Sequence, residues 1–302
     1  MNQLPVTSYQ SPVNDLSKPQ ILAKILSLRD AGLLYDLPAA IEDDDLYGSL
    51  DRFADIALRL RFSRVILDVG AGTGILVGIL SALGHSVYAV DFFDKGNASV
   101  FKKASCIFSV CNIEADSLPF DDATFDAVCC CQTLEHFTHA HLPSILEMRR
   151  VLKVGGILEI DVPNAASLRN RIRLLRGKHI TWDYKEHYLT VEPSLYKGRE
   201  YYPNRHNREF VLTELKQLYE VAGFDNIEVA HLRDERIRIG LNRAKSIGSW
   251  IRNLIPATRK SLIGFGIKPP ASTHTSQSAN PQAAQAQKQA DESSPTTGVV
   301  PG

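Results

Sequence analysis

The stretch that decides the fold is DVGAGTG at residues 68–74, directly after the apolar run RVIL at 64–67. Glycines after a buried strand let the backbone approach a ligand where a Cβ atom would collide with it. The following helix offers the unpaired backbone N–H groups of its first turn. This loop therefore predicts a ligand site at the end of a buried strand.

The spacing of the glycines indicates which class of nucleotide the loop binds. A dinucleotide fingerprint reads G-x-G-x-x-G, whereas Gly70, Gly72 and Gly74 form G-x-G-x-G and Ile75 occupies the sixth place. Asp91 ends the next apolar segment, SVYAVD, where a carboxylate accepts hydrogen bonds from both hydroxyls of a ribose. The alternative role for Asp91 is to cap a helix. Loop and acid together predict a ligand that contains adenosine.

Asp68 narrows the choice of ligand further. A carboxylate inside the glycine loop repels a pyrophosphate but attracts the cationic amino-acid end of S-adenosylmethionine. Its alternative role is also that of a helix-terminus cap. The loop therefore favours a sulfonium ligand over a nicotinamide dinucleotide, and a dehydrogenase is the weakest alternative.

Strand-like and helix-like segments alternate after two amphipathic helical patterns in residues 19–60. Alternation of this kind predicts a parallel sheet with right-handed crossovers, that is, a doubly wound α/β domain. The second helical pattern places Leu50, Phe53, Ile56, Ala57 and Leu60 on one face. The alternating segments read RVILDVG, GILVGILSALG, SVYAVD, ASCIFSVC, FDAVCCC, LPSILEMRRVLKVGG and ILEIDVP.

Five motifs in order give the chain a resemblance to a known family. They are DVGAGTG, the acid Asp91, LPFDDATFDAV at 118–128, LEHF at 134–137 and RVLKVGGILEIDVPN at 150–164. With them the chain resembles the class I S-adenosylmethionine-dependent methyltransferases of the small-molecule and glycan type (types 11 and 23). The resemblance covers residues 62–163 and implies a Rossmann-like sheet of seven strands with S-adenosylmethionine as methyl donor.

The resemblance also assigns donor contacts. It gives the methionine and ribose portions of the donor to Asp68, Gly70, Gly72 and Gly74, and the ribose hydroxyls to Asp91. The family has an acid for the adenine amino group where this sequence has Asn112. The amide oxygen of Asn112 still accepts that hydrogen bond, and the backbone N–H of Ile113 is placed to meet the adenine ring.

The candidates for activating the acceptor follow the fourth strand. If the acceptor is a hydroxyl, a group near neutral pKa must take its proton, and histidine fits that task. We select His136 in LEHF, with Glu135 to orient it; both are equally suited to capping the next helix. His187 and His206 are rival bases. No metal site is predicted, because His139 and His141 lack a ligand pattern and the five cysteines suit buried, reduced thiols.

Basic residues mark two further segments. SLRNRIRLLRGK at 167–178 predicts a basic helix, and Arg169, Arg173 and Arg205 are candidates for binding an anionic group of the substrate. The alternative is a solvated helix face. The segment 242–268 mixes cations with apolar residues, a pattern suited to an anionic membrane surface, to the domain itself or to a second subunit.

The expected organisation has four parts. Residues 1–18 form a polar arm, 19–241 the methyltransferase domain with an insertion or lid at 164–210, 242–268 the basic amphipathic segment and 269–302 a disordered tail. The start, MNQLPVTSYQ, lacks the pattern of a signal peptide, and no apolar run reaches the length of a membrane span. We therefore expect a cytoplasmic protein, with peripheral contact at the inner membrane surface as an option.

The predicted function is methyl transfer from S-adenosylmethionine to a small molecule or glycan, lipid-linked or free, at an oxygen atom. One alternative is a module that binds the donor without turnover. Another is a nucleic-acid methyltransferase, which the net charge of +0 and the sequence CQTLEHF after the fourth strand both disfavour. Enzymes of this fold that methylate base amino groups commonly have Asp or Asn, two prolines and an aromatic residue at that place.

Overall fold

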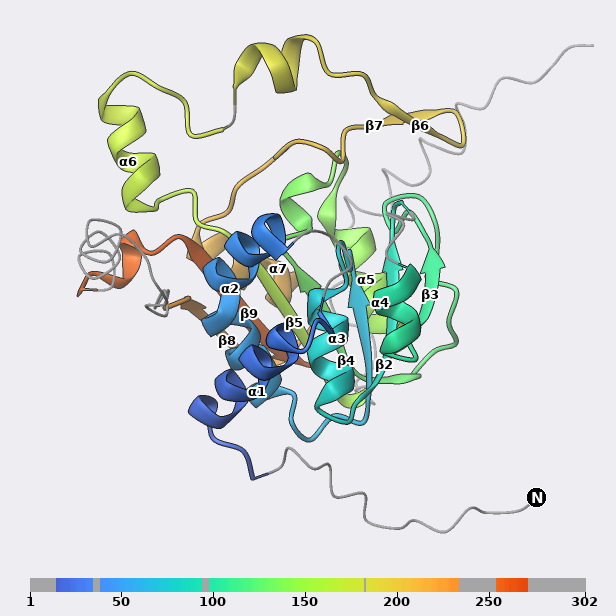
Figure 1. The fold of residues 1–302 in the computed structure, drawn as a ribbon. Coiled ribbons are helices and arrows are strands. Elements are labelled where there is room, and N and C mark those ends of the chain that lie inside the picture. The colour runs from blue at the N-terminus through green and yellow to red at the C-terminus, as the bar shows by residue number, and fades with distance from the viewer. Residues whose placement is uncertain (1–14, 35–38, 94–97, 182, 234–253, 271–302) are drawn as a thin grey trace, which may run out of the picture. The chain divides into compact units, whose positions relative to one another are not determined.

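A mixed sheet of seven strands organises the computed structural model, which describes residues 15–34, 39–93, 98–181, 183–233 and 254–270 (Figure 1). The first five strands are parallel, and β9 runs antiparallel to both of its neighbours. The predicted seven-stranded, doubly wound sheet is therefore confirmed. The spatial order is β3 (Ile107–Val110), β2 (Ser86–Asp91), β1 (Val65–Val69), β4 (Phe125–Cys131), β5 (Leu152–Pro163), β9 (Ser261–Ile267) and β8 (Asp225–His231).

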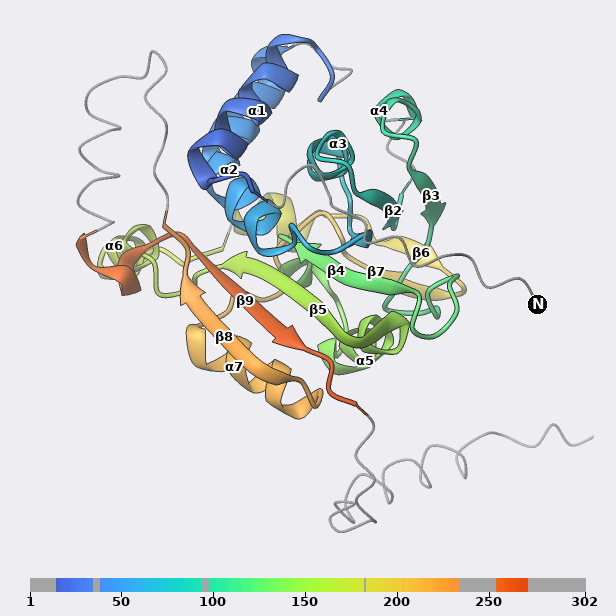
Figure 2. The same ribbon diagram turned by 90° about the horizontal axis from the view of Figure 1, so that it is seen from below.

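Helices cover both faces of this sheet (Figure 2). One face carries α1 (Lys18–Asp30), α2 (Ala39–Arg59), α3 (Ile75–Ala82) and α4 (Ala98–Lys103), and the other carries α5 (His141–Val151) and α7 (Leu212–Val221). The predicted apolar face, which comprises four residues of α2 and Leu60 directly after it, is buried at all five positions. Helices on both sides explain why β1 and β4 read as nearly continuous apolar runs rather than as alternating ones.

The run of three cysteines belongs to the core of β4. Cys129 and Cys130 are buried and Cys131 is half-buried, and all three are free thiols. Burial raises the pKa of the Cys129 and Cys130 thiols well above the ordinary value, because a thiolate there would lose its hydration. Cys129 and Cys130 are therefore buried core residues, and their reduced state stays a prediction.

The segment between β5 and α7 includes residues 164–210, where the insertion or lid is expected. It contains α6 (Leu168–Leu175), a π-helical turn at Lys185–Leu189 and a hairpin of β6 (Ser194–Tyr196) and β7 (Arg199–Tyr201). In Figure 1 it runs along the carboxyl ends of the parallel strands. The hairpin is fixed there by Phe92, whose ring lies 5.9 Å from the ring centroids of both Tyr196 and Tyr201.

The C-terminal boundary of the domain lies further along the chain than the sequence indicated. The expected domain ended at residue 241, but β9 at Ser261–Ile267 is inserted between β5 and β8 in the sheet. The segment at 242–268 therefore includes a strand of the sheet. The sequence did not predict this strand, because the glycines and cations of the segment weaken the strand pattern. Residues 1–14 of the polar arm and the tail from 271 lie outside the described residues. In the described part of the chain, no helix combines the length and apolarity that crossing a membrane requires.

Two glycines of β9 make room for a buried tyrosine. A Cβ atom at Gly264 would lie 2.6 Å from Cε2 of Tyr219, and one at Gly266 would lie 2.6 Å from its Cδ1. The Tyr219 hydroxyl donates to the carbonyl oxygen of Gly264 at 2.8 Å. The ring is fully buried and has no room to retreat.

We therefore expect Gly264→Ala to lower the free energy of unfolding by about 1–3 kcal/mol through overpacking. Gly78→Ala adds the same methyl group in α3, where the nearest atom is the end of the Leu34 side chain at 3.3 Å. That control should change stability by less than about 1 kcal/mol, because alanine also favours the helix by about that amount. Urea denaturation of both variants checks this, and equal midpoints would contradict the packing argument.

Candidate functional site

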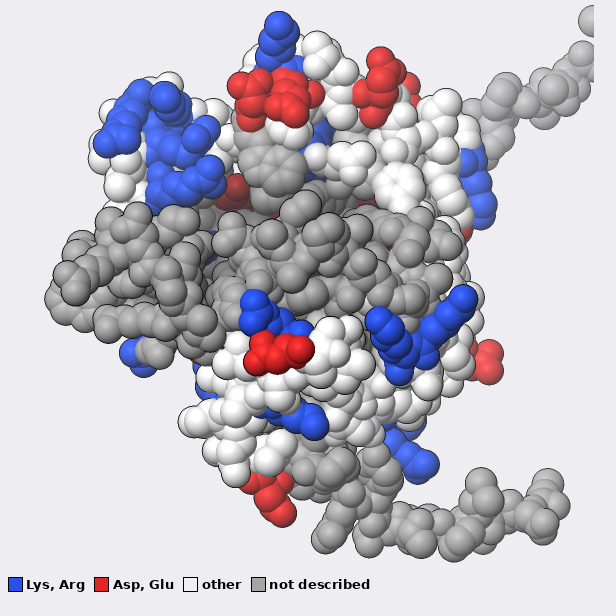
Figure 3. All heavy atoms as spheres, in the orientation of Figure 1, with Lys and Arg blue, Asp and Glu red and all other residues white. Residues whose placement is uncertain are grey.

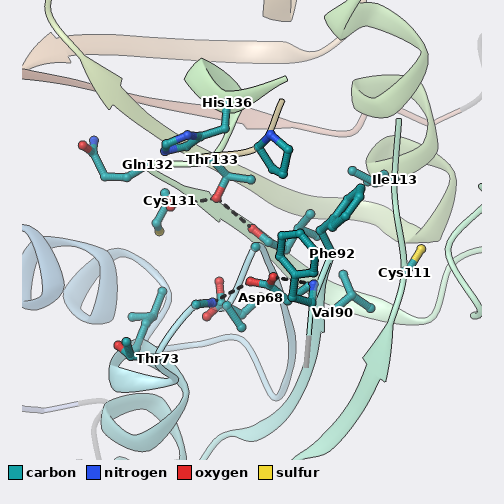
Figure 4. A pocket seen from close by; sticks show the side chains of 18 of the residues that line it. Asp68, Thr73, Val90, Phe92, Cys111, Ile113, Cys131, Gln132, Thr133 and His136 are labelled. Carbon is teal, nitrogen blue, oxygen red and sulfur yellow. Dashed lines mark hydrogen bonds between the residues drawn. The ribbon is translucent and has the colours of Figure 1, made fainter. Parts of the chain in front are cut away.

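A cavity of about 580 Å³ opens at the carboxyl ends of the parallel strands. This is the edge at which open α/β sheets bind ligands. Figure 4 shows side chains from the ends of β1, β2, β3 and β4 converging on it. Its lining includes Arg52, Phe53, Asp68, Gly70, Gly72, Ile75, Asp91, Phe92, Asn112, Ile113, Cys131, Gln132, Thr133, His136, Pro203 and Asn204.

The glycine loop is held open by left-handed backbone at three positions. Gly70, Gly72 and Gly74 have φ angles of 77°, 54° and 78°, which residues with a Cβ rarely adopt. A Cβ at Gly70 would lie 2.2 Å from Oγ1 of Thr133, and one at Gly74 would press on Phe101. At Gly72 the nearest atom is 3.9 Å away, so this glycine leaves open space beside the cavity. Gly70 and Gly72 line the cavity, whereas Gly74 packs the loop against α4.

Asp91 fixes the loop as well as lining the cavity. One carboxylate oxygen accepts a hydrogen bond from the Gly72 N–H at 2.8 Å, and the other accepts one from the Phe93 N–H at 3.1 Å. The carbonyl oxygen of Val90 also accepts from Gly70 N–H at 2.8 Å. The end of β2 therefore determines where the glycine loop lies. Each carboxylate oxygen of Asp91 keeps a lone pair for a further donor.

Asp68 is a buried acid with an unpaired oxygen, because Oδ1 has no hydrogen-bond partner. Burial, and then the charges of Asp91 and Asp161, raise its pKa to about 7. A cation in the cavity would pair with this carboxylate and lower the pKa again. The residue thus fits the cationic amino-acid end of S-adenosylmethionine.

Asn112 and Ile113 lie at the end of β3, on the side of the cavity next to β2. The Asn112 Oδ1 accepts from the Glu114 N–H at 3.1 Å, and its Nδ2 has no partner. An amide oxygen has a second lone pair, so this contact leaves Asn112 able to accept from an adenine amino group. Ile113 lines the cavity beside it.

Charged residues that the sequence analysis did not select lie beneath the cavity. The strand register places Asp68, Cys129 and Glu159 in one row across β1, β4 and β5, and Asp161 follows two residues later on the same face. The guanidinium of Arg52, from α2, contacts Asp161 Oδ1 at 3.2 Å. Two acids spaced i, i+2 in the apolar strand EIDVP were the signal available in the sequence.

Glu135, His136 and His206 form one cluster at the β4 end of the cavity. His136 lines the cavity, and its ring meets that of His206 edge to face at 4.9 Å between centroids. Glu135 is buried behind it, and burial raises the pKa of its carboxyl well above the ordinary value. His187 is absent from the lining, and its carbonyl oxygen accepts from Arg205 at 3.4 Å.

The three arginines proposed for the substrate do not line the cavity. Arg173 donates to the carbonyl oxygens of His179 and Thr181, and so closes the loop after α6. Arg169 is exposed on α6, over which basic side chains gather (Figure 3). Arg205 stacks over Tyr202 at 4.0 Å. It directly follows Asn204, which does line the cavity, so of the three it lies closest in sequence to the site.

Comparisons with known proteins agree with this geometry. Residues 67–160 match the family model described as a methyltransferase domain. A probable methyltransferase, ltbC, of Aspergillus luteorubrus is 38% identical over 113 residues, which are 31% of this chain and 38% of that protein. The ubiquinone/menaquinone biosynthesis C-methyltransferase UbiE of Pseudomonas paraeruginosa is 27% identical over 64% of this chain and 77% of its own length.

A solved structure resembles the fold. A chain in the complex between the Haloferax volcanii Trm112 methyltransferase activator and the putative methyltransferase superposes with a TM-score of 0.50 at 17% identity. The match covers 83% of this chain and 98% of that one. The strand order, the glycine loop with the acids Asp68 and Asp91, and the family match lead to one conclusion: residues 67–160 form a class I S-adenosylmethionine-dependent methyltransferase domain, with S-adenosylmethionine as methyl donor.

Proposed function

We propose that the protein transfers the methyl group of S-adenosylmethionine to a hydroxylated small molecule or glycan, and that His136 and Glu135 activate the acceptor. The observation that carries this proposal is that His136 lines the same cavity as the glycine loop and Asp91. Donor and acceptor would then meet in one enclosure. The bound donor supplies a methyl group on a cationic sulfur, which becomes neutral as the methyl leaves.

The work of the protein in such a reaction is mainly alignment and exclusion of water. We assign Asp68 to the amino-acid end, Asp91 to the ribose hydroxyls, and Asn112 with Ile113 to the adenine. The Gly72 backbone leaves space for the ligand to pass. His136 stands at the acceptor side, where removal of a hydroxyl proton would make the oxygen a nucleophile.

The relatives suggest a refinement of the acceptor. UbiE is named as a C-methyltransferase of quinone biosynthesis, and a hydroxylated ring deprotonated at oxygen is nucleophilic at oxygen and at the neighbouring ring carbon. Activation of a hydroxyl at His136 thus serves either outcome. We propose oxygen as the acceptor atom and take methylation of a ring carbon as the second candidate.

Peripheral membrane contact through 242–268 stays a prediction, as does a cytoplasmic location. Residues 242–253 lie outside the described residues, and Ser261–Ile267 belongs to the sheet as β9. Between them Leu254 and Ile255 are 59% and 60% exposed, which leaves two apolar side chains for such a contact.

Gly72→Val tests the donor loop. The branched side chain would stand in left-handed backbone and fill the space beside the cavity, so we expect donor affinity to fall roughly 10- to 100-fold. Gly198→Val is the matched control, because Gly198 also has a positive φ, of 76°, with nothing within 4 Å of its Cβ position. Calorimetric titration with S-adenosylmethionine measures both. Normal binding by Gly72→Val would refute the loop assignment.

Asp68 predicts a pH dependence of donor binding. Its pKa of about 7 means that the carboxyl is neutral at pH 5.5 and mostly ionised at pH 7.5. An ionised carboxylate attracts the donor's ammonium group, so the wild-type protein should bind the donor more tightly at pH 7.5. Asp68→Asn should remove this dependence and weaken binding by about tenfold at pH 7.5. Asp122→Asn, at an exposed acid that does not line the cavity, should leave the pH profile unchanged.

The raised pKa also has a consequence for stability in the absence of donor. The folded state binds the Asp68 proton more tightly than the unfolded state, so this residue destabilises the fold as pH rises from about 4 to 7. Asp68→Asn should therefore be more stable than the wild-type protein at pH 8 while binding the donor less well. Loss of stability in that variant would contradict the predicted shift.

His136→Ala tests the acceptor side. We expect donor binding to persist and methyl transfer to fall by about 10²- to 10⁴-fold, as for the loss of an acid–base group. Transfer of labelled methyl to fractionated small-molecule extracts provides the assay, and mass spectrometry identifies a product heavier by one methyl group. His139→Ala, at a half-exposed histidine nearby, is the control.

The same assay decides between the competing functions. Donor binding without transfer to any fraction would favour a binding module. Transfer to nucleic acid rather than to small molecules would favour a nucleic-acid methyltransferase.

A further inference from the structure

Three potential metal ligands meet beside the cavity. Glu135, His136 and His206 each offer one ligand atom, and these atoms all lie within 4.8 Å of one another. Glu135 is only 1% exposed, and its Oε2 has no hydrogen-bond partner. A buried carboxylate oxygen without a partner is costly unless a cation or a donor meets it.

The backbone holds the two segments of this cluster together. The Glu135 carbonyl oxygen accepts from the Asn207 N–H at 2.7 Å and from the Arg208 N–H at 3.2 Å. The Asn207 side chain donates to the carbonyl oxygen of His136 at 2.8 Å. The cluster is therefore built before any ligand arrives, as a metal site requires for high affinity.

Both histidines have their Nδ1 atoms next to an acceptor. Nδ1 of His136 lies 3.1 Å from the carbonyl oxygen of Arg205, and Nδ1 of His206 lies 3.5 Å from a carboxylate oxygen of Glu209. A neutral imidazole that donates from Nδ1 carries its lone pair on Nε2. Metal-binding histidines almost always have such a partner on the other ring nitrogen.

A second group of possible ligands gives a useful contrast. Cys131, Glu159 and Asp161 also lie close together, but there Arg52 already supplies the positive charge and Gln132 donates to Asp161 at 2.6 Å. Within the described residues, no group donates a hydrogen bond to Oε2 of Glu135. The two clusters thus differ in direct contacts: Asp161 accepts from Arg52 and Gln132, whereas the Arg52 charge lowers the pKa of Glu135 without a hydrogen bond to its Oε2.

We propose that Glu135, His136 and His206 bind a divalent transition-metal ion that activates the acceptor hydroxyl. Two histidines and one carboxylate leave coordination positions open for substrate oxygen. The inference rests on the proposed function: the bound hydroxyl loses its proton to solvent, and its oxygen attacks the methyl carbon as the bond from carbon to sulfur breaks. The products are a methyl ether and a neutral thioether. His136 then acts as a ligand rather than as the base itself.

The test uses the full chain stripped of metal with a chelator and titrated with Mn²⁺ and with Zn²⁺. We expect one ion per chain from at least one of the two metals. His206→Ala and Glu135→Gln should each lower that affinity at least about tenfold. His139→Ala, outside the cluster, should bind as the wild-type chain does. Glutamine keeps the size of the buried side chain, and donor binding reports that each variant is folded.

Two results would overturn the proposal: neither ion binds, or the ion binds equally well to the two cluster variants. The second result would indicate adventitious binding elsewhere on the surface. The donor is titrated into the same stripped protein. Donor binding without metal binding would reject the metal site and leave the proposed function standing, whereas metal binding without donor binding would reject the proposed function.

Discussion

The buried guanidinium of Arg52 is the constraint on which the carboxyl edge of the sheet depends. Its charge lowers the pKa of Asp68 and Glu159, which burial raises, and it forms an ion pair with Asp161 at 3.2 Å. Removal of a buried cation would leave the acids uncompensated, a more severe loss than the absence of the whole pair. Because Arg52 comes from α2, the helices that precede the first strand are part of the site rather than an accessory to the fold.

The donor side of the cavity depends on a second, local connection. Asp91 accepts a hydrogen bond from the Gly72 N–H, so one carboxylate both fixes the glycine loop and lines the cavity. The left-handed backbone lets Gly70 pack closely against Thr133, where a Cβ would not fit, and leaves open space at Gly72. Such a site is largely formed in advance, and the protein loses little conformational entropy when the donor binds.

The sequence predicted the parts of this arrangement that rest on local pattern. The apolar strands, the spaced glycines and Asp91 lie close together in the sequence. Their pattern was therefore enough to predict the sheet and the donor loop. Arg52 was not predicted as a site residue because its partner Asp161 lies 109 residues away in the sequence. Nothing in the sequence of α2 distinguishes Arg52 from a cation exposed to solvent. Strand β9 was not predicted because Gly264 and Gly266 weaken the strand pattern in the sequence. The same two glycines leave the space in which Tyr219 packs.

The insertion at 164–210 matters to the chemistry because it completes the cavity. Pro203 and Asn204 line it, and Asn207 ties this segment to His136. The β6–β7 hairpin is anchored beside Asp91 through Phe92 and through the ion pair of Lys197 with Asp116 at 2.5 Å. One segment therefore contacts both the β2 end and the β4 end of the cavity. Changes in its sequence would alter which acceptor fits without disturbing the glycine loop, because β1 and β2 position that loop independently.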